Sequence, residues 1–186
     1  MSIVDLMLLG FLKEKPMNAY EIKKTAEQRN LTWWIKVSYP SMYRNINKLA
    51  DRGYIDGEIV REGEMPEKTI YTINEKGEAY FLELMTRYSK QPESIYIDFT
   101  AVISNLGKVD KETGEQMIDD LYLQFLKTKK IMQAVESTYD KYQAKAVLQL
   151  NVQMYELFCS WLEQFKENFY CSTINKEEKI ETDKII

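Results

Sequence analysis

The stretch SYPSMYRNINKLADRGYI, residues 38–55, decides the fold. Ser38 is a typical N-cap, and Pro40 falls in the first turn of the following helix, where its missing N–H costs little. Gly53 fits the left-handed position that ends a helix. Three apolar side chains share one face of this helix and are expected to pack inward: Met42, Ile46 and Leu49. The stretch therefore predicts an amphipathic helix whose polar and basic face meets solvent.

Two helices are expected before this stretch. Residues 3–13 carry apolar side chains at helical spacing, and Pro16 ends that segment because it cannot continue a helix. Asn18 and Glu21 have the spacing of a capping box, which predicts a second helix directly after Asn18. The segment LTWWIKV, residues 31–37, is aromatic and β-branched, which is typical of a short strand or a buried connection.

A β-hairpin is expected after the quoted stretch. Two β-rich segments, about 58–62 and 69–73, flank the turn-prone sequence GEMPEK, and Asn74 is placed to start another helix. The order helix, helix, helix, hairpin is that of a winged helix-turn-helix, in which the hairpin is the wing. The sequence therefore predicts a winged helix-turn-helix DNA-binding domain over residues 1–88.

The remainder of the chain is expected to be all helical, so the fold class is mainly α. One helix is predicted over 93–106, a second from an N-cap at Asp110 to about Tyr142, and a last one over 144–170. The apolar spacing of the second helix indicates a seam that faces another helix. The stripe of the last helix is too wide for one neighbour, so we expect it to pack against its own domain on one side and another subunit on the other. Residues 92–173 are predicted as a dimerisation domain and 174–186 as a flexible charged tail. The predicted dimerisation residues are Leu121, Phe125, Met132, Val135, Met154, Phe158, Trp161 and Phe165.

Composition argues against several functions. The chain contains no histidine, which removes the common zinc sites and the Ser–His and Cys–His nucleophiles, and its two cysteines are too few for a Cys-only zinc site. Its seven glycines form no phosphate-binding loop. No apolar run is long enough for a membrane span, and no signal peptide is present. We therefore expect a cytoplasmic protein that is not an enzyme and needs no metal or cofactor.

Charge is segregated along the chain. The whole sequence has 25 basic and 29 acidic residues, yet residues 15–52 carry eight basic side chains against three acidic ones, a surplus of five. Such a local basic surplus is the electrostatic pattern of a nucleic-acid-binding face, although a basic helix surface is often only solvated. On the third helix, Arg44 can pair with a guanine edge and Asn45 with an adenine edge. Double-stranded DNA is thus the expected partner.

Three segments together resemble the PadR family of bacterial transcriptional regulators. These are LMLLGFLKEKPMNAYEIKK, the quoted stretch 38–55, and EKTIYTINEKGEAY, and they span about residues 5–80. The matching positions are Pro16, Met17, Tyr20, Glu21, Ile22, Ser38, Ser41, Tyr43, Leu49, Gly53, Ile55, Tyr71, Ile73 and Gly77. Arg44 departs from the pattern, because the family usually has a proline there. An arginine at this position points to an unusual base preference.

The resemblance implies a repressor that binds a palindromic operator as a two-fold homodimer, the long helical C-terminal half being that of the larger PadR subfamily. It also places Tyr43 at the DNA face, although packing beside Ile46 is an equal alternative. The complete set of predicted DNA contacts is Tyr20, Lys23, Lys24, Ser38, Tyr39, Ser41, Tyr43, Arg44, Asn45, Lys48, Arg61 and Lys68.

Two questions stay open at this point. Family members often respond to small aromatic or hydrophobic molecules, and Trp33 and Trp34 are the effector-binding candidates, although aromatic residues are more often part of a core. The acidic residues Glu64 and Glu67 near the wing tip favour an alternative function, a winged-helix adaptor that binds proteins rather than a DNA sequence.

Overall fold

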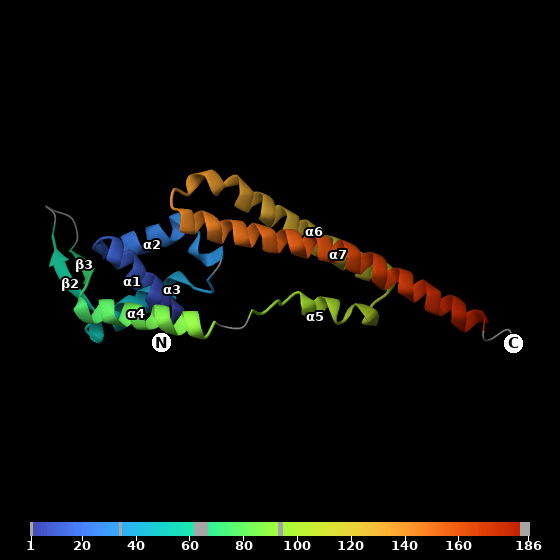
Figure 1. The fold of residues 1–186 in the computed structure, drawn as a ribbon, viewed down its shortest axis with the longest axis horizontal. Coiled ribbons are helices and arrows are strands. Elements are labelled where there is room, and N and C mark those ends of the chain that lie inside the picture. Colours follow the sequence, from blue (N-terminus) through green and yellow to red (C-terminus); the bar gives the residue numbers. More distant parts are fainter. Residues whose placement is uncertain (1, 34, 62–66, 93–94, 183–186) are drawn as a thin grey trace. The chain divides into compact units, whose positions relative to one another are not determined.

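The computed structural model describes residues 2–33, 35–61, 67–92 and 95–182, with side chains described as far as residue 170. The chain divides into two units, Met1–Ser94 and Ile95–Ile186 (Figure 1). Each unit is described by itself below.

Four helices of the N-terminal unit begin at side-chain caps. They are α1 (Ile3–Glu14), α2 (Ala19–Gln28), α3 (Tyr39–Asp51) and α4 (Glu75–Lys90). The caps at Asn18, Ser38 and Asn74 confirm the sequence-based prediction, and Asn18 forms its capping box with Glu21. Gly53 adopts a φ of 69°, the left-handed conformation expected at the end of α3.

A three-stranded antiparallel sheet accompanies these helices. Its strands are β1 (Met17–Asn18), β2 (Ile55–Val60) and β3 (Lys68–Ile73), in the order β1-β3-β2. The expected hairpin is formed by β2 and β3, and β2 begins earlier than predicted because Ile55 already pairs with Ile73. The short β1 was not predicted; it pairs Met17 with Tyr71 across the sheet. The arrangement is a winged helix-turn-helix.

The segment after α2 is not a strand. Leu31–Trp33 form a 3-10 helix, η1, because Asn30 reverses the chain with a φ of 48° and its carbonyl accepts a 2.9 Å hydrogen bond from the Trp33 N–H. Local hydrogen bonds therefore satisfy the backbone where a strand would need a neighbour. Of the two structures expected for this segment, the strand is wrong for residues 31–33, whereas the buried Leu31 agrees with a buried connection. Trp34 lies outside the described residues.

One apolar core holds the N-terminal unit together. It joins α1, α2, α3 and α4 to the sheet, and the predicted inward stripe of α3 is part of it. The buried members are Val4, Leu8, Leu9, Phe11, Leu12, Met17, Ile22, Ala26, Leu31, Met42, Ile46, Leu49, Ile55, Tyr80 and Leu84.

A carboxylate is also buried in this unit. Asp5, only 8% exposed, accepts a 3.3 Å hydrogen bond from the hydroxyl of Tyr80. Burial, followed by the charge of Asp5, raises the pKa of Tyr80 to about 12. The Tyr80 ring stacks on Tyr54 with ring centroids 4.3 Å apart. The hydrogen bond fastens α1 to α4.

The C-terminal unit consists of helices alone in the part that is described. In chain order they are α5 (Thr100–Ile103), the 3-10 helix η2 (Leu106–Lys108), α6 (Lys111–Ala134), the 3-10 helix η3 (Glu136–Thr138) and α7 (Tyr142–Thr182). Asp110 caps α6 as predicted and accepts a 2.9 Å hydrogen bond from the Thr113 N–H. The helix α7 extends beyond residue 170 into the segment predicted as a tail.

Two predicted helices are shorter than the sequence indicated. The segment 95–99 is not helical, because both the N–H and the hydroxyl of Thr100 bond to the Ile97 carbonyl in a local turn before α5. The helix α6 ends at Ala134 rather than near Tyr142, and the Thr138 hydroxyl donates to the Val135 carbonyl at 2.7 Å in the turn that follows. Short-range side-chain bonds thus interrupt apolar patterns that continue across these points.

The helices α6 and α7 pack along each other. Leu106, Ile118, Leu162 and Tyr170 form the buried cluster between the elements of this unit. Lys166 pairs with Asp119 at 2.6 Å and Lys129 with Glu156 at 3.6 Å, which adds polar links between the two helices.

Candidate nucleic-acid interface

The helix α3 has a buried face and an exposed face. Met42, Ile46 and Leu49 are buried, whereas the opposite face is open to solvent. The exposed side chains of α3 are Pro40, Tyr43, Arg44, Asn47, Lys48 and Asp51. Of the residues predicted as DNA contacts on this helix, the structure exposes Tyr43, Arg44 and Lys48 most clearly.

The start of α3 is fixed by two serines. The Ser38 hydroxyl accepts from the Ser41 N–H, and the Ser41 hydroxyl donates to the Ser38 carbonyl at 2.7 Å. Both predicted contacts are thus engaged in the cap, where they set the direction of the helix. The positive end of the helix dipole lies at the same place and favours an anion such as phosphate.

The helix α2 contributes further exposed groups. Tyr20 is 67% exposed, and Lys24 is exposed as well. Lys23 forms an ion pair with Glu27 at 3.4 Å, and its Nζ atom lies 5.4 Å from the centre of the Tyr39 ring at the start of α3. Lys23 and Tyr39 therefore connect the two helices, which leaves Lys24 as the freer cation.

The hairpin carries the remaining predicted contacts. Arg61 is exposed directly after β2, and Lys68 is half-buried at the start of β3, paired in the sheet with Val60. Glu67 is exposed beside Lys68, whereas Glu64 at the tip lies outside the described residues. Both basic residues flank the wing, as the sequence indicated.

Asn45 is placed differently from the other predicted base contact. It is half-buried at a polar cavity of about 110 Å³ between α1 and α3, whereas Arg44 is exposed. The cavity is lined by Ser2, Asp5, Asn45, Lys48, Leu49 and Arg52. The structure therefore does not bring Asn45 and Arg44 onto the same part of the helix surface.

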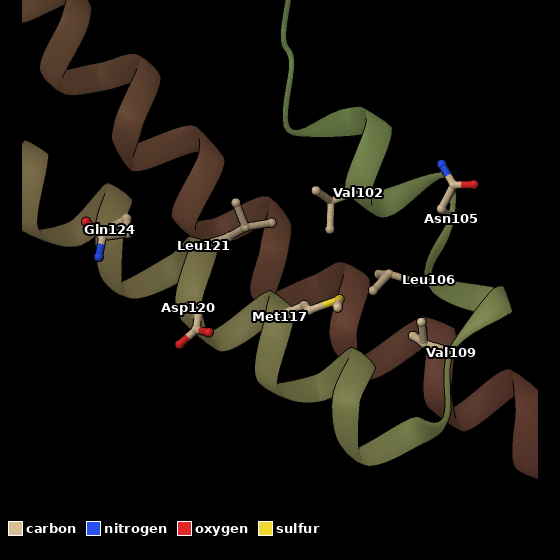
Figure 2. A pocket seen from close by; sticks show the side chains of 8 residues that line it. All are labelled: Val102, Asn105, Leu106, Val109, Met117, Asp120, Leu121 and Gln124. Atoms are coloured by element: carbon tan, nitrogen blue, oxygen red, sulfur yellow. The ribbon is translucent and has the colours of Figure 1, made fainter.

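The C-terminal unit contains a larger cavity of about 490 Å³. Figure 2 shows it between the segment that carries α5 and η2 and the helix α6, with aliphatic side chains pointing into the space from both sides. Leu106 is buried at its base, and Asn105 at its margin accepts a 2.6 Å hydrogen bond from Lys108. The lining residues are Val102, Asn105, Leu106, Val109, Met117, Asp120, Leu121 and Gln124. Trp33, an effector candidate from the sequence, is not among them.

The predicted dimerisation residues fall into two groups. On α6, Met132 is only 2% exposed and thus buried within one chain, and Leu121 and Phe125 are half-buried, as is Val135 directly after the helix. On α7, Met154, Phe158 and Phe165 are half-buried, and Phe158 forms an aromatic cluster with Phe99 and Phe125. Trp161 is exposed. Much of the predicted surface thus packs within the chain.

An apolar stripe on α7 is not fully covered within the chain. Its members alternate at spacings of three and four residues and are exposed or half-buried: Val147, Leu150, Met154, Leu157 and Trp161. Met154 and Trp161 are among the predicted dimerisation residues, and the other three belong to the wide apolar stripe expected on this helix. The buried positions Leu148 and Leu162 lie beside the stripe on the same helix.

The described residues hold neither a metal-binding cluster nor a membrane-spanning helix. No group of three or more Cys, Asp or Glu side chains that could hold a metal ion occurs in the described part of the chain. Within the same residues, no helix is long and apolar enough to cross a membrane.

Comparison with known proteins finds one family and several solved structures that this chain resembles. Residues 8–83 match the transcriptional regulator PadR-like family. The chain is 20% identical over 146 residues to the negative transcriptional regulator PadR of Bacillus subtilis (strain 168), which covers 78% of each chain.

Solved structures have the same fold. The crystal structure of Bacillus subtilis PadR in complex with operator DNA matches with a TM-score of 0.79 and 18% identity, covering 90% of this chain and 97% of that chain. The same protein in complex with p-coumaric acid matches with a TM-score of 0.75 and 17% identity, covering 89% and 98%. Residues 8–83 thus match the transcriptional regulator PadR-like family, and the fold of the chain, through its C-terminal helices, is that of the solved PadR structures.

Proposed function

We propose that this protein is a DNA-binding repressor that acts as a homodimer on a palindromic operator. The observation that carries the proposal is the exposed face of α3, whose side chains Tyr43, Arg44, Asn47 and Lys48 are open to solvent. The face is basic although the net charge of the whole chain is −4. A curated relative is a negative regulator, and a structural neighbour was solved with operator DNA. The family consists of regulators rather than enzymes.

The mechanism follows from the two faces of α3. Its buried stripe anchors the helix in the core, so the exposed face can enter a major groove, which is wide enough for one helix. Arg44 would pair with a base edge, whereas Lys24 and Lys48 would contact phosphates and position the helix. The wing residues Arg61 and Lys68 would follow the backbone beside it.

The exposed stripe on α7 supports self-association. Leu150 and Leu157 are 57% and 62% exposed, and together with Val147, Met154 and Trp161 they repeat at the spacing of a coiled-coil seam over about four turns. Contiguous exposed apolar side chains of this kind mark interaction surfaces. A second copy of the chain would cover the stripe, since an identical helix offers the same spacing.

The cavity of the C-terminal unit is the candidate effector site. Its volume of about 490 Å³ is within the range of small-molecule sites, and its walls are mostly aliphatic. Among the described residues that line it, none is basic and Asp120 is acidic, so we expect it to favour the apolar body of a ligand over a carboxylate. A matched pair of probes tests this: 4-ethylphenol should bind more tightly than p-coumaric acid in a calorimetric titration. Val102→Phe should fill the space and abolish the signal; binding that survives this change would place the effector elsewhere.

Selection from a random-duplex library tests the main proposal. The purified protein should enrich a palindrome, and affinity for it should fall steeply between about 50 and 200 mM salt, as expected when several phosphates are contacted. An enriched sequence without two-fold symmetry would contradict the dimeric reading. No enrichment together with a flat salt dependence would contradict DNA recognition and favour the protein-binding adaptor.

A further inference from the structure

We infer that Asn47, rather than Asn45, is the second base-reading residue of α3 and acts with Arg44 to read an adenine next to a guanine. This inference rests on the proposed function, because it names the side chains that give the DNA-binding face its sequence preference. It follows from where the helix surface places the two asparagines.

Asn45 lies beside the buried stripe of the helix. It is three residues after Met42 and four before Leu49, and both of these side chains are buried in the core. Accordingly Asn45 is half-buried and lines the small polar cavity with Ser2, the N-cap of α1, and with Asp5 of α1. A half-buried amide beside the core offers less of its hydrogen-bonding edge to a base than an exposed one.

Asn47 lies on the opposite side. It is exposed, and it is three residues after Arg44 and four after Tyr43, which are exposed too. Residues at these separations are neighbours on a helix surface. Tyr43, Arg44 and Asn47 therefore form one continuous outward patch, with Lys48 at its side.

The chemistry of this patch specifies what it reads. An arginine guanidinium can donate two hydrogen bonds to the O6 and N7 atoms of guanine, and an asparagine amide can pair with N6 and N7 of adenine. Three residues of helix separate Arg44 from Asn47 by about 4.5 Å along the axis. Successive base pairs are about 3.4 Å apart. The two side chains thus match neighbouring base pairs, and each half-site should contain a guanine and an adenine one or two positions apart.

The test compares three variants on the operator selected by the wild-type protein. Each base pair of one half-site is changed in turn, and binding is measured by fluorescence anisotropy with the wild type, Asn47→Ala, Asn45→Ala and Asn47→Arg. The affinity of the wild type should fall roughly 5- to 150-fold when the adenine is replaced. Asn47→Ala should remove this preference at that position alone, and Asn47→Arg should shift it toward guanine. Asn45→Ala, the matched control, should keep the wild-type preference at every position.

The outcomes separate this inference from the proposed function. If the wild type selects an operator but Asn47→Ala keeps every preference while Asn45→Ala loses one, the inference is overturned and DNA recognition stands. If the wild type selects no sequence, the proposed function fails and there is no base for Asn47 to read. Circular dichroism and urea denaturation of each variant show that a changed preference does not come from unfolding.

Discussion

The N-terminal unit buries fifteen apolar side chains in one cluster, whereas the buried cluster of the C-terminal unit has four among the residues that the structure describes. The C-terminal unit instead exposes leucines such as Leu150 and Leu157 on α7. The N-terminal unit thus buries a large core within one chain, whereas the C-terminal unit exposes apolar side chains along α7, where we propose that a second copy of the chain binds. Under the proposed function, the N-terminal unit suits DNA binding and the C-terminal unit suits self-association.

Replacing one glycine in each unit by alanine should give the largest difference in the free energy of unfolding. A Cβ atom on Gly77 would overlap the backbone carbonyl oxygen of Tyr54 and lie 2.8 Å from the Ile73 side chain, and neither neighbour can easily move. On Gly114 the overlap is with the hydroxyl of Tyr170, the far end of a side chain. We expect Gly77→Ala to cost about 3 kcal/mol in the free energy of unfolding and Gly114→Ala about 1 kcal/mol or less. Urea denaturation of the full chain measures both, and equal costs would contradict the contrast.

Two buried tyrosine hydroxyls offer the next comparison. Tyr80 donates to the buried Asp5, whereas the buried hydroxyl of Tyr170 has no hydrogen-bond partner among the described residues. Tyr80→Phe should therefore cost about 1–3 kcal/mol, because it leaves a buried carboxylate without its donor. Tyr170→Phe should leave the free energy of unfolding unchanged or raise it. A loss of similar size in both variants would show that the Asp5 contact contributes little.

The Tyr80 contribution should also depend on pH. Folding raises the pKa of Tyr80 from 10.0 to about 12, so the neutral hydroxyl is favoured in the folded state. The resulting stability is fully present below pH 10 and is lost as the pH rises from 10 to 12. The difference in unfolding free energy between wild type and Tyr80→Phe should shrink over this interval. A difference in unfolding free energy that stays constant from pH 10 to 12 would contradict the raised pKa of Tyr80.

Two exposed leucines test the proposed self-association surface on α7, and here the expected change in free energy is the smallest. Leu157 on α7 is 62% exposed and Leu82 on α4 is 66% exposed, so neither is needed by its own core. Leu157→Glu should weaken self-association by about 1–2 kcal/mol, roughly 5- to 30-fold in the dimer dissociation constant, because it places a charge in the proposed interface. Leu82→Glu should change nothing. Sedimentation velocity across a dilution series distinguishes the two, and equal behaviour would argue against the α7 stripe as the interface.

Local signals in the sequence were enough for much of the N-terminal unit. The caps at Asn18, Ser38 and Asn74 and the left-handed Gly53 depend on neighbours within a few residues, so their patterns predicted the helix ends correctly. For the segment 31–37 the sequence left a strand and a buried connection open, and the strand did not form at residues 31–33 because the turn at Asn30 supplied local hydrogen bonds instead. Composition cannot show whether a strand will find a partner.

The sequence was enough to locate the helix that carries the candidate site, but not to show which of its side chains lie on the exposed face. The basic surplus located α3, yet Arg44 and Asn45 were paired because they are adjacent in sequence, although adjacent helix residues point about 100° apart. Counting from the buried Met42 and Leu49 would have set Asn45 aside and drawn attention to Asn47. The cavity between the α5–η2 segment and α6 could not be predicted, because it depends on how two short helical elements pack against α6, where the apolar pattern indicated one helix over 93–106.

The most direct test of DNA binding through α3 is the salt dependence of binding by a doubly neutralised variant. Lys24 and Lys48 are exposed on α2 and α3, and Lys127 and Lys130 are exposed on α6, so Lys24→Ala/Lys48→Ala can be compared with Lys127→Ala/Lys130→Ala at equal net charge. Anisotropy titrations of a fluorescent duplex at several salt concentrations give the slope of log K against log salt. We predict that the first variant lowers the magnitude of this slope by about 2, because two phosphate contacts are lost, and that the second leaves it unchanged. Equal slopes for both variants and the wild type would contradict the assignment of this face to DNA.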